Sequence, residues 1–189
     1  MAIPYTILAV SGSLRAQSSN TEVLRAAALL APSDVTITFF DGLAGLPHFN
    51  PDLDGDGASL PEEVAALRAH VGEADALMIC SPEYAHGVPG SLKNALDWLV
   101  SGPEIPYKPV ALLNASPRSR HAQAALAETL RTMSAVLAPD AAVDVPLNGR
   151  RFDAVAIAET PELATPIRDA LMALVNAVSA SRDRRRDLV

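Results

Sequence analysis

The sequence predicts an α/β protein in which two layers of helices sandwich a five-stranded parallel sheet. Five short apolar runs are typical of strands buried on both faces, and they alternate with five longer amphipathic segments that are typical of helices. Repeated strand–helix–strand units with right-handed crossovers build an open sheet that is covered on both sides. We therefore expect a single domain over residues 1–189.

The predicted elements follow one another without an internal repeat. We expect strands at residues 5–10, 35–40, 76–81, 110–114 and 141–145, and helices at residues 21–30, 62–71, 92–99, 123–136 and 162–179. Ser19 and Glu22 have the spacing of a capping box at the start of the first helix. Residues 41–59, with their Gly, Pro and Asp content, are expected to form the one long loop.

The composition limits the partners and the compartment. A formal net charge of −7 favours neither nucleic acid nor an acidic membrane surface, and the basic run at residues 182–186 is expected to be a solvated helix end. Cys80 is the only cysteine, which excludes an internal disulfide and suits the cytoplasm; it closes an apolar strand and is predicted to belong to the core. We recognise no secretion signal and no apolar run of about 18 residues, so we expect no membrane span.

The loop between the first strand and the first helix has the composition of an anion site. Its polar residues are Ser11, Ser13, Arg15, Ser18, Ser19 and Asn20. Hydroxyl and amide groups donate to phosphate oxygens, and an arginine adds charge and a fork of donors. The free N–H groups of the following helix point back at this loop, which favours a phosphate. Gly12 allows a sharp turn or a close approach to a ligand, and an ordinary capped helix start is the alternative interpretation.

A second unusual loop, SPEYAHGVPG at residues 81–90, follows the third strand. Its two prolines and two glycines hold a shaped loop with exposed backbone groups, and the alternative is a rigid turn without a ligand. In the doubly wound strand order 2-1-3-4-5, the first and third strands are neighbours whose helices lie on opposite faces. A crevice opens between them at the carboxyl ends of the strands, and both loops border it. Proteins of this flavodoxin-like topology bind FMN there.

The two loops together resemble the NADPH-dependent FMN reductase family, the flavodoxin-like quinone, chromate and azo reductases. Residues 12–20 match the family's phosphate loop G-S-L-R-x-x-S-x-N, and residues 82–98 match its second signature, which begins Pro-Glu-Tyr. The resemblance covers roughly residues 5–138. It implies a flavodoxin-like three-layer α/β/α sandwich, FMN as the cofactor and NADPH or NADH as the co-substrate.

The resemblance also implies roles for individual residues. Those that would hold the FMN phosphate are Ser13, Arg15, Ser18 and Asn20. Those whose backbone would meet the edge of the flavin ring are Pro82, Glu83 and Tyr84. Ala85 stands where the family has Asn, which removes a side-chain contact, and Ser116 lies in a third loop that lacks the family's glycines. Because the flavin performs the redox chemistry, no catalytic side chain is predicted.

Other patterns lead to weaker expectations. The residues with the spacing of a calcium loop are Asp52, Asp54, Asp56, Gly57 and Glu63. Ser59 and Pro61 interrupt that loop and no helix pattern leads into it, so we expect a polar surface loop and no metal. His86 is either a polar contact at the mouth of the crevice or a surface turn residue. Trp98 and Leu99 pack in the core or in a subunit contact, and the resemblance implies a homodimer or homotetramer.

The predicted function is ping-pong transfer of a hydride from NAD(P)H through FMN to a small-molecule acceptor. The resemblance implies a quinone, a free flavin, chromate or an azo compound as that acceptor. Two alternatives stay open. One is an FMN-binding electron carrier or redox sensor without direct NAD(P)H turnover, and the other is a module that binds a different phosphorylated ligand.

Overall fold

The computed structural model describes residues 4–55 and 58–186, with side chains up to residue 183. Within these ranges the strands are β1 (Tyr5–Ser11), β2 (Val35–Phe39), β3 (Ala76–Cys80), β4 (Pro109–Asn114) and β5 (Val136–Asp144). They pair in parallel in the order β2-β1-β3-β4-β5, so the predicted topology is confirmed. This order places the ends of β1 and β3 side by side.

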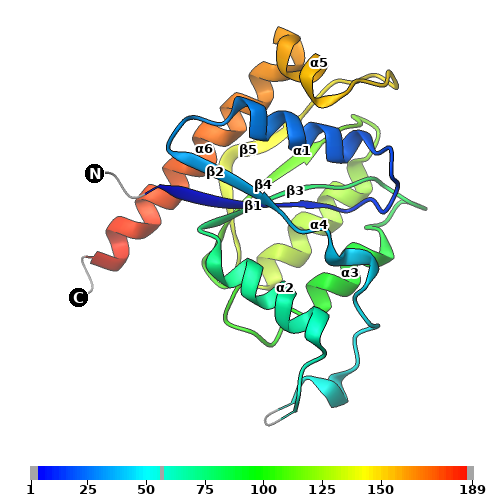
Figure 1. Cartoon of the computed structure of the whole chain (residues 1–189), viewed down its shortest axis with the longest axis vertical. Helices are drawn as coiled ribbons and strands as arrows, with labels where there is room; N and C mark the ends of the chain where they lie inside the picture. Colours follow the sequence, from blue (N-terminus) through cyan, green and yellow to red (C-terminus); the bar gives the residue numbers. More distant parts are fainter. Residues whose placement is uncertain (1–3, 56–57, 187–189) are drawn as a thin grey trace.

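Two helical layers cover the sheet (Figure 1). One layer holds α1 (Ser19–Leu30), α5 (Ala154–Glu159) and α6 (Pro161–Arg186), and the other holds α2 (Glu62–Glu73), α3 (Gly90–Asp97) and α4 (Arg120–Thr132). Side chains alternate along each strand, so Ile7 and Ala9 enter the first core while Leu8 and Val10 enter the second. The central strand β3 is buried on both faces and is apolar throughout, whereas the edge strands β2 and β5 include exposed polar residues.

The boundaries of α4 and β5 both differ from the prediction. The helix expected at residues 123–136 is α4, which ends at Thr132 because Ser134 adopts a left-handed conformation with φ of 62°. The strand expected at residues 141–145 begins at Val136. Val110 of β4 pairs with Leu137 but Leu112 pairs with Ala142, so residues 138–141 form a bulge. Pro139 and Asp140 interrupt the apolar pattern at this bulge, which hid the first half of the strand.

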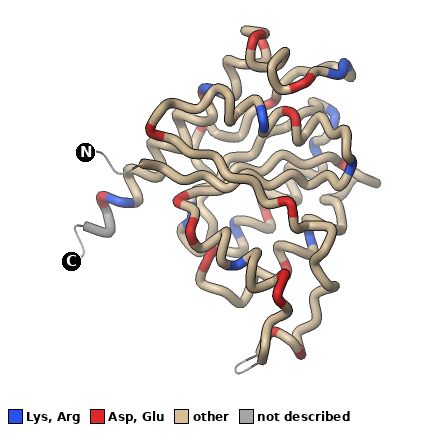
Figure 2. Tube along the Cα trace, in the orientation of Figure 1, with Lys and Arg blue, Asp and Glu red and all other residues tan. Residues whose placement is uncertain are grey.

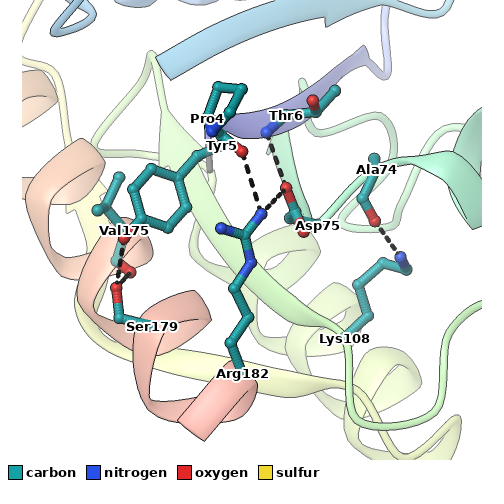
Figure 3. Close-up of polar contacts among 9 residues, drawn as sticks. All are labelled: Pro4, Tyr5, Thr6, Ala74, Asp75, Lys108, Val175, Ser179 and Arg182. Carbon is teal, nitrogen blue, oxygen red and sulfur yellow. Dashed lines mark hydrogen bonds and ion pairs between the residues drawn. The ribbon is translucent and has the colours of Figure 1, made fainter. Parts of the chain in front are cut away.

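The end of α6 is tied to the amino edge of the sheet (Figure 3). Arg182 donates to the Pro4 carbonyl at 3.1 Å and to the Asp75 carboxylate at 2.8 Å, and its guanidinium lies 4.7 Å from the Tyr5 ring centroid. The expectation of a solvated helix end is therefore wrong for Arg182. The side chains of residues 184–186 lie outside the described part of the chain. Elsewhere, charges of both signs are spread over both helical layers (Figure 2).

The long loop expected at residues 41–59 includes two short 3-10 turns, η1 (Gly42–Ala44) and η2 (Pro51–Leu53), and α3 holds it in place. The Pro47 carbonyl accepts hydrogen bonds from Asn94 at 2.9 Å and from the Trp98 indole at 2.8 Å. Trp98 and Leu99 are buried in the core, which decides between the two predicted roles of these residues.

The calcium-like pattern in this loop is engaged in protein contacts. The Asp54 carboxylate pairs with Arg68 at 2.7 Å and accepts a hydrogen bond from Ser101 at 2.6 Å. Asp56 and Gly57 of the same pattern lie outside the described residues. Over the part of the chain that the structure describes, no three His, Cys, Asp or Glu side chains gather as metal ligands. Within the same ranges, no helix combines the length and apolar character needed to cross a bilayer.

Candidate functional site

The loops that follow β1, β3, β4 and β5 gather at the carboxyl ends of the strands (Figure 1). Residues of these loops line two adjoining cavities. Each has a volume of about 560 Å³. The first is lined by the loop after β1, by Pro82 and Tyr84, and by residues 151–153. The second is lined by the loops after β3, β4 and β5. The residues that line both are Ser19, Asn20, Pro82 and Arg151.

Most of the predicted site residues meet at these cavities. Those at the first cavity are Ser13, Arg15, Ser18, Ser19, Asn20, Pro82 and Tyr84. Glu83 and Ser116 line the second cavity. Ser11 and Ala85 line neither cavity. The Ser11 and Thr21 hydroxyl groups share a hydrogen bond of 2.9 Å, and Ala85 is part of a turn. The structure therefore groups the predicted set with those two exceptions.

Gly12 brings the loops after β1 and β3 into contact. Its backbone N–H donates to the Cys80 carbonyl at 2.9 Å. A Cβ atom at residue 12 would lie 2.8 Å from the Cβ of Ser81 and 3.0 Å from a methyl group of Leu92. Of the two roles predicted for Gly12, a close approach is what the structure requires, and the neighbour is the loop that begins at Ser81.

The start of α1 offers unsatisfied donors to the first cavity. Ser18 is the N-cap residue, and its side chain makes no capping hydrogen bond. The capping box predicted for Ser19 and Glu22 is wrong, because Glu22 pairs with Arg25 at 2.7 Å and accepts from the Ala154 N–H at 2.9 Å. The N–H groups of the first turn of α1 therefore face the cavity without a side-chain partner, which is the arrangement that binds anions.

Two further residues of the first loop, Arg15 and Asn20, differ in whether their polar side-chain groups already have partners within the protein. Arg15 is exposed and forms no ion pair with any described residue. The Asn20 side-chain oxygen accepts a hydrogen bond from the Cys80 thiol at 3.3 Å, so Asn20 also connects α1 to the end of β3. The Arg15 side chain is thus available to a ligand. Asn20 uses its side-chain oxygen to bind Cys80, which leaves its NH2 group for a ligand in the cavity.

Cys80 is fully buried, which confirms its predicted place in the core. Burial raises the pKa of its thiol to about 12, and a hydrogen bond with the Ala115 backbone opposes part of that rise. The thiol therefore stays protonated at neutral pH and donates to Asn20. A neutral, inaccessible thiol is not a nucleophile.

The loop after β3 contains a tight turn that the sequence pattern did not specify. Tyr84 and Gly87 exchange backbone hydrogen bonds of 3.1 and 2.9 Å, and Ala85 and His86 have φ values of 48° and 60°. Positive φ at both central residues defines a type I′ turn, which favours Asn or Gly. His86 is exposed and stacks on His121 of α4, with ring centroids 4.4 Å apart. The surface-turn interpretation of His86 is therefore the one the structure supports.

Glu83 connects this loop to the next helix. Its carboxylate accepts a hydrogen bond from the Ala122 N–H at 2.8 Å, in the first turn of α4. In the neighbouring loop, Asn114 accepts from the Ser116 N–H at 3.1 Å and donates to Asp144 at 2.7 Å. Side-chain hydrogen bonds thus shape the third loop, in place of the glycines that are missing from it.

Sequence reasoning missed one part of the site, the segment between β5 and α5. Its residues at the first cavity are Arg151, Phe152 and Asp153. Arg151 donates to Gln17 of the first loop at 3.5 Å, across 134 residues of sequence. The two adjacent arginines before Phe152 were the one available signal, and nothing in their spacing connects them to residues 11–20.

Comparison with known proteins places this geometry in a family. The family model for NADPH-dependent FMN reductase matches residues 5–146. A 2-hydroxy-1,4-benzoquinone reductase from a Burkholderia species is 46% identical over 92 residues, which cover 49% of this chain and 48% of that protein. An NAD(P)H-dependent FMN reductase from Pseudomonas aeruginosa is 39% identical over 118 residues, covering 61% of this chain and 62% of that protein. The match thus spans about half to three fifths of these relatives.

A solved structure extends the similarity along the chain. FerB, a flavoenzyme NAD(P)H:(acceptor) oxidoreductase from Paracoccus denitrificans, superposes with a TM-score of 0.75 at 27% identity. The superposition covers 93% of this chain and 98% of that one. Since the family model also matches most of the sequence, from β1 through β5, the chain belongs to the NADPH-dependent FMN reductase family.

Proposed function

We propose that the protein is an FMN-dependent NAD(P)H oxidoreductase that reduces small-molecule acceptors, with quinones as the first class to test. The observation that carries this proposal is the first cavity, where an uncapped helix start and an unpaired Arg15 meet the loop after β3. It lies where the strand order reverses, which is the ligand-binding position of doubly wound sheets. Names of relatives support the acceptor class, since one is a 2-hydroxy-1,4-benzoquinone reductase and another a quinone reductase.

The donors at the first cavity fit a flavin phosphate. We assign the phosphate to Ser13, Arg15, Ser18, Ser19 and Asn20, and to the first N–H groups of α1. A phosphate monoester carries about −1.5 to −2 charge at neutral pH, which a guanidinium and a helix N-terminus both stabilise. A volume of about 560 Å³ falls within the usual range of small-molecule sites.

We assign the flavin ring to the second cavity and to the border between the two cavities. The residues there are Pro82, Glu83, Tyr84 and Ser116. Bound FMN supplies the hydride chemistry. The protein's part is to orient the ring: the bond from Ala122 to Glu83 fixes the second loop against α4, and Tyr84 presents an aromatic surface that is 53% exposed. No acid–base pair is required by this scheme.

The test begins with the absorbance spectrum of the purified full-length chain. Bound FMN gives visible absorbance, and anaerobic mixing with NADPH or NADH in a stopped-flow instrument should bleach it rapidly. A protein that stays colourless after incubation with FMN would contradict the whole proposal. Slow bleaching with both nucleotides, together with tight FMN binding, would instead support an electron carrier.

Arg15→Ala tests the phosphate assignment. Loss of a charge-assisted hydrogen bond should weaken FMN binding by about 10- to 100-fold, measured by quenching of flavin fluorescence. Arg131→Ala is the matched control, because it removes the same charge from an exposed ion pair with Glu128 at 3.8 Å. Equal FMN affinities in the two variants would remove Arg15 from the site.

The assembly and compartment are part of the same proposal. We propose a homodimer or homotetramer that works in the cytoplasm, consistent with a single buried cysteine and an overall charge of −7. Light scattering coupled to size exclusion determines the oligomeric state directly, and a monomer at micromolar concentration would contradict this part.

A further inference from the structure

We propose that Arg151, from the segment between β5 and α5, is a second cationic ligand of the cofactor phosphate and gives the site its preference for FMN over unphosphorylated flavin. This inference rests on the proposed function, because it assigns a residue to the same site. Arg151 lies beyond residue 146, where the family match ends, so the family's phosphate loop does not account for it.

The charged residues that line the first cavity indicate an anionic ligand that contacts two arginine side chains. Its positively charged lining residues are Arg15, Arg25 and Arg151, and its negatively charged ones are Glu22 and Asp153. Both carboxylates are engaged. Glu22 pairs with Arg25 and accepts from the start of α5, while Asp153 caps α5 by accepting from the Ala156 N–H at 2.8 Å.

Arg15 and Arg151 are therefore left without a carboxylate partner among the described residues. Two guanidinium groups that line one cavity make it attractive to an anion. A flavin phosphate close to a dianion satisfies both, whereas a single carboxylate or a neutral ribityl chain does not. The protein as a whole has a net charge of −7, so the excess of arginines over carboxylates that line the first cavity is opposite in sign to the overall charge.

The fold places Arg151 beside the first loop and leaves most of its guanidinium hydrogen-bond donors without a protein partner among the described residues. The segment is fixed at its far side, where Glu22 of α1 accepts from Ala154, and Arg150 lies 4.9 Å from the Phe152 ring centroid. The Arg151 side chain is exposed, and its bond to Gln17 is long, at 3.5 Å, so it lies beside the first loop while its other guanidinium donors stay available to a ligand. An arginine fork held this way is suited to two hydrogen bonds with one phosphate.

The experiment compares FMN with riboflavin, which lacks the phosphate, on the full-length chain stripped of flavin. Arg151→Ala should lower FMN affinity by about 10- to 100-fold, while riboflavin affinity changes by less than about twofold. Arg151→Lys keeps the charge but loses the fork, so its FMN affinity should fall between those of the wild type and Arg151→Ala. Arg131→Ala is the charge-matched control outside both cavities and should retain the wild-type FMN-to-riboflavin ratio.

The outcomes separate this inference from the proposed function. If the wild-type chain binds no FMN, the proposed function fails first. If it binds FMN and Arg151→Ala keeps the wild-type preference for FMN over riboflavin, only the role of Arg151 is overturned. An equal loss of FMN and riboflavin would assign Arg151 a structural role in shaping the cavity and would also overturn the inference. Thermal unfolding of each variant shows that the comparison is made on folded protein, and Arg151→Lys decides the matter if Arg151→Ala does not fold.

Discussion

Replacing Gly12 by Ala should separate the two loops that form the proposed flavin site. The added Cβ would lie 2.8 Å from the Cβ of Ser81, whereas ordinary carbon–carbon contact begins at about 3.5 Å. The Leu92 methyl group, at 3.0 Å, belongs to a flexible side-chain end and can rotate away. The Ser81 Cβ cannot, because it is attached directly to the backbone. The loops must therefore move apart by roughly 0.7 Å.

Overpacking of this kind in a buried contact costs about 1–3 kcal/mol. For a domain of this size, each kcal/mol lowers Tm by about 2–4 °C, so a clear decrease in Tm is expected. FMN affinity should fall as well, since ligand groups on the two loops lose their relative positions. Differential scanning calorimetry and a fluorescence titration with FMN measure the two effects.

Two variants make the result specific to the steric contact. Gly12→Ala combined with Ser81→Gly removes the opposing Cβ and should recover much of the lost stability. Gly90→Ala is the matched control, because a Cβ there meets nothing within 4 Å, and its Tm should not fall. A Gly12→Ala protein with the wild-type Tm would refute the packing argument. A lowered Tm with unchanged FMN affinity would refute the link between loop spacing and cofactor binding.

Two further predictions concern the second loop and the core. Ala85 has φ of 48°, so Ala85→Asn should stabilise the protein by about 1 kcal/mol in thermal unfolding, whereas Ala85→Val should destabilise it; the opposite order would contradict the type I′ turn. The pKa of Cys80 is raised from 9.0 to about 12 in the folded state, so its stabilising contribution is complete below pH 9 and is lost as the pH rises toward 12. Urea unfolding at pH 8 and pH 10 should therefore show a loss of about 1 kcal/mol that Cys80→Ala lacks, and equal losses in both proteins would contradict the buried thiol.

The sheet order and the two principal loops could be predicted because they depend on local patterns. Each of these patterns predicts the structure of the segment in which it occurs. This holds for the apolar runs, the turn residues and the polar sequence from Ser11 to Asn20. Topology then brought the first and second loops together without further information. Local patterns were sufficient wherever a residue's role is set by its immediate neighbours.

The remaining features depend on contacts that no local pattern encodes. Glu83 reads as a loop carboxylate, yet it caps a helix 39 residues later. Glu22 has the spacing of a capping box, yet it supports α5, which begins 132 residues further along the chain. Arg151 reaches the first loop only because the parallel strands β1 and β5 end on the same side of the sheet. Tertiary packing, rather than the local sequence, determines the hydrogen-bond partners of these three side chains.

The bulge in β5 bears on how the protein behaves when many copies are crowded together. An exposed, regular edge strand offers its free N–H and C=O groups to a strand of another molecule, which begins aggregation. β5 lies at the edge of this sheet, and within its bulge Pro139 has no N–H to offer while Asp140 carries an exposed charge at φ of 61°. A strand arriving from a second chain meets a kinked, charged edge, so growth of the sheet stops at β5.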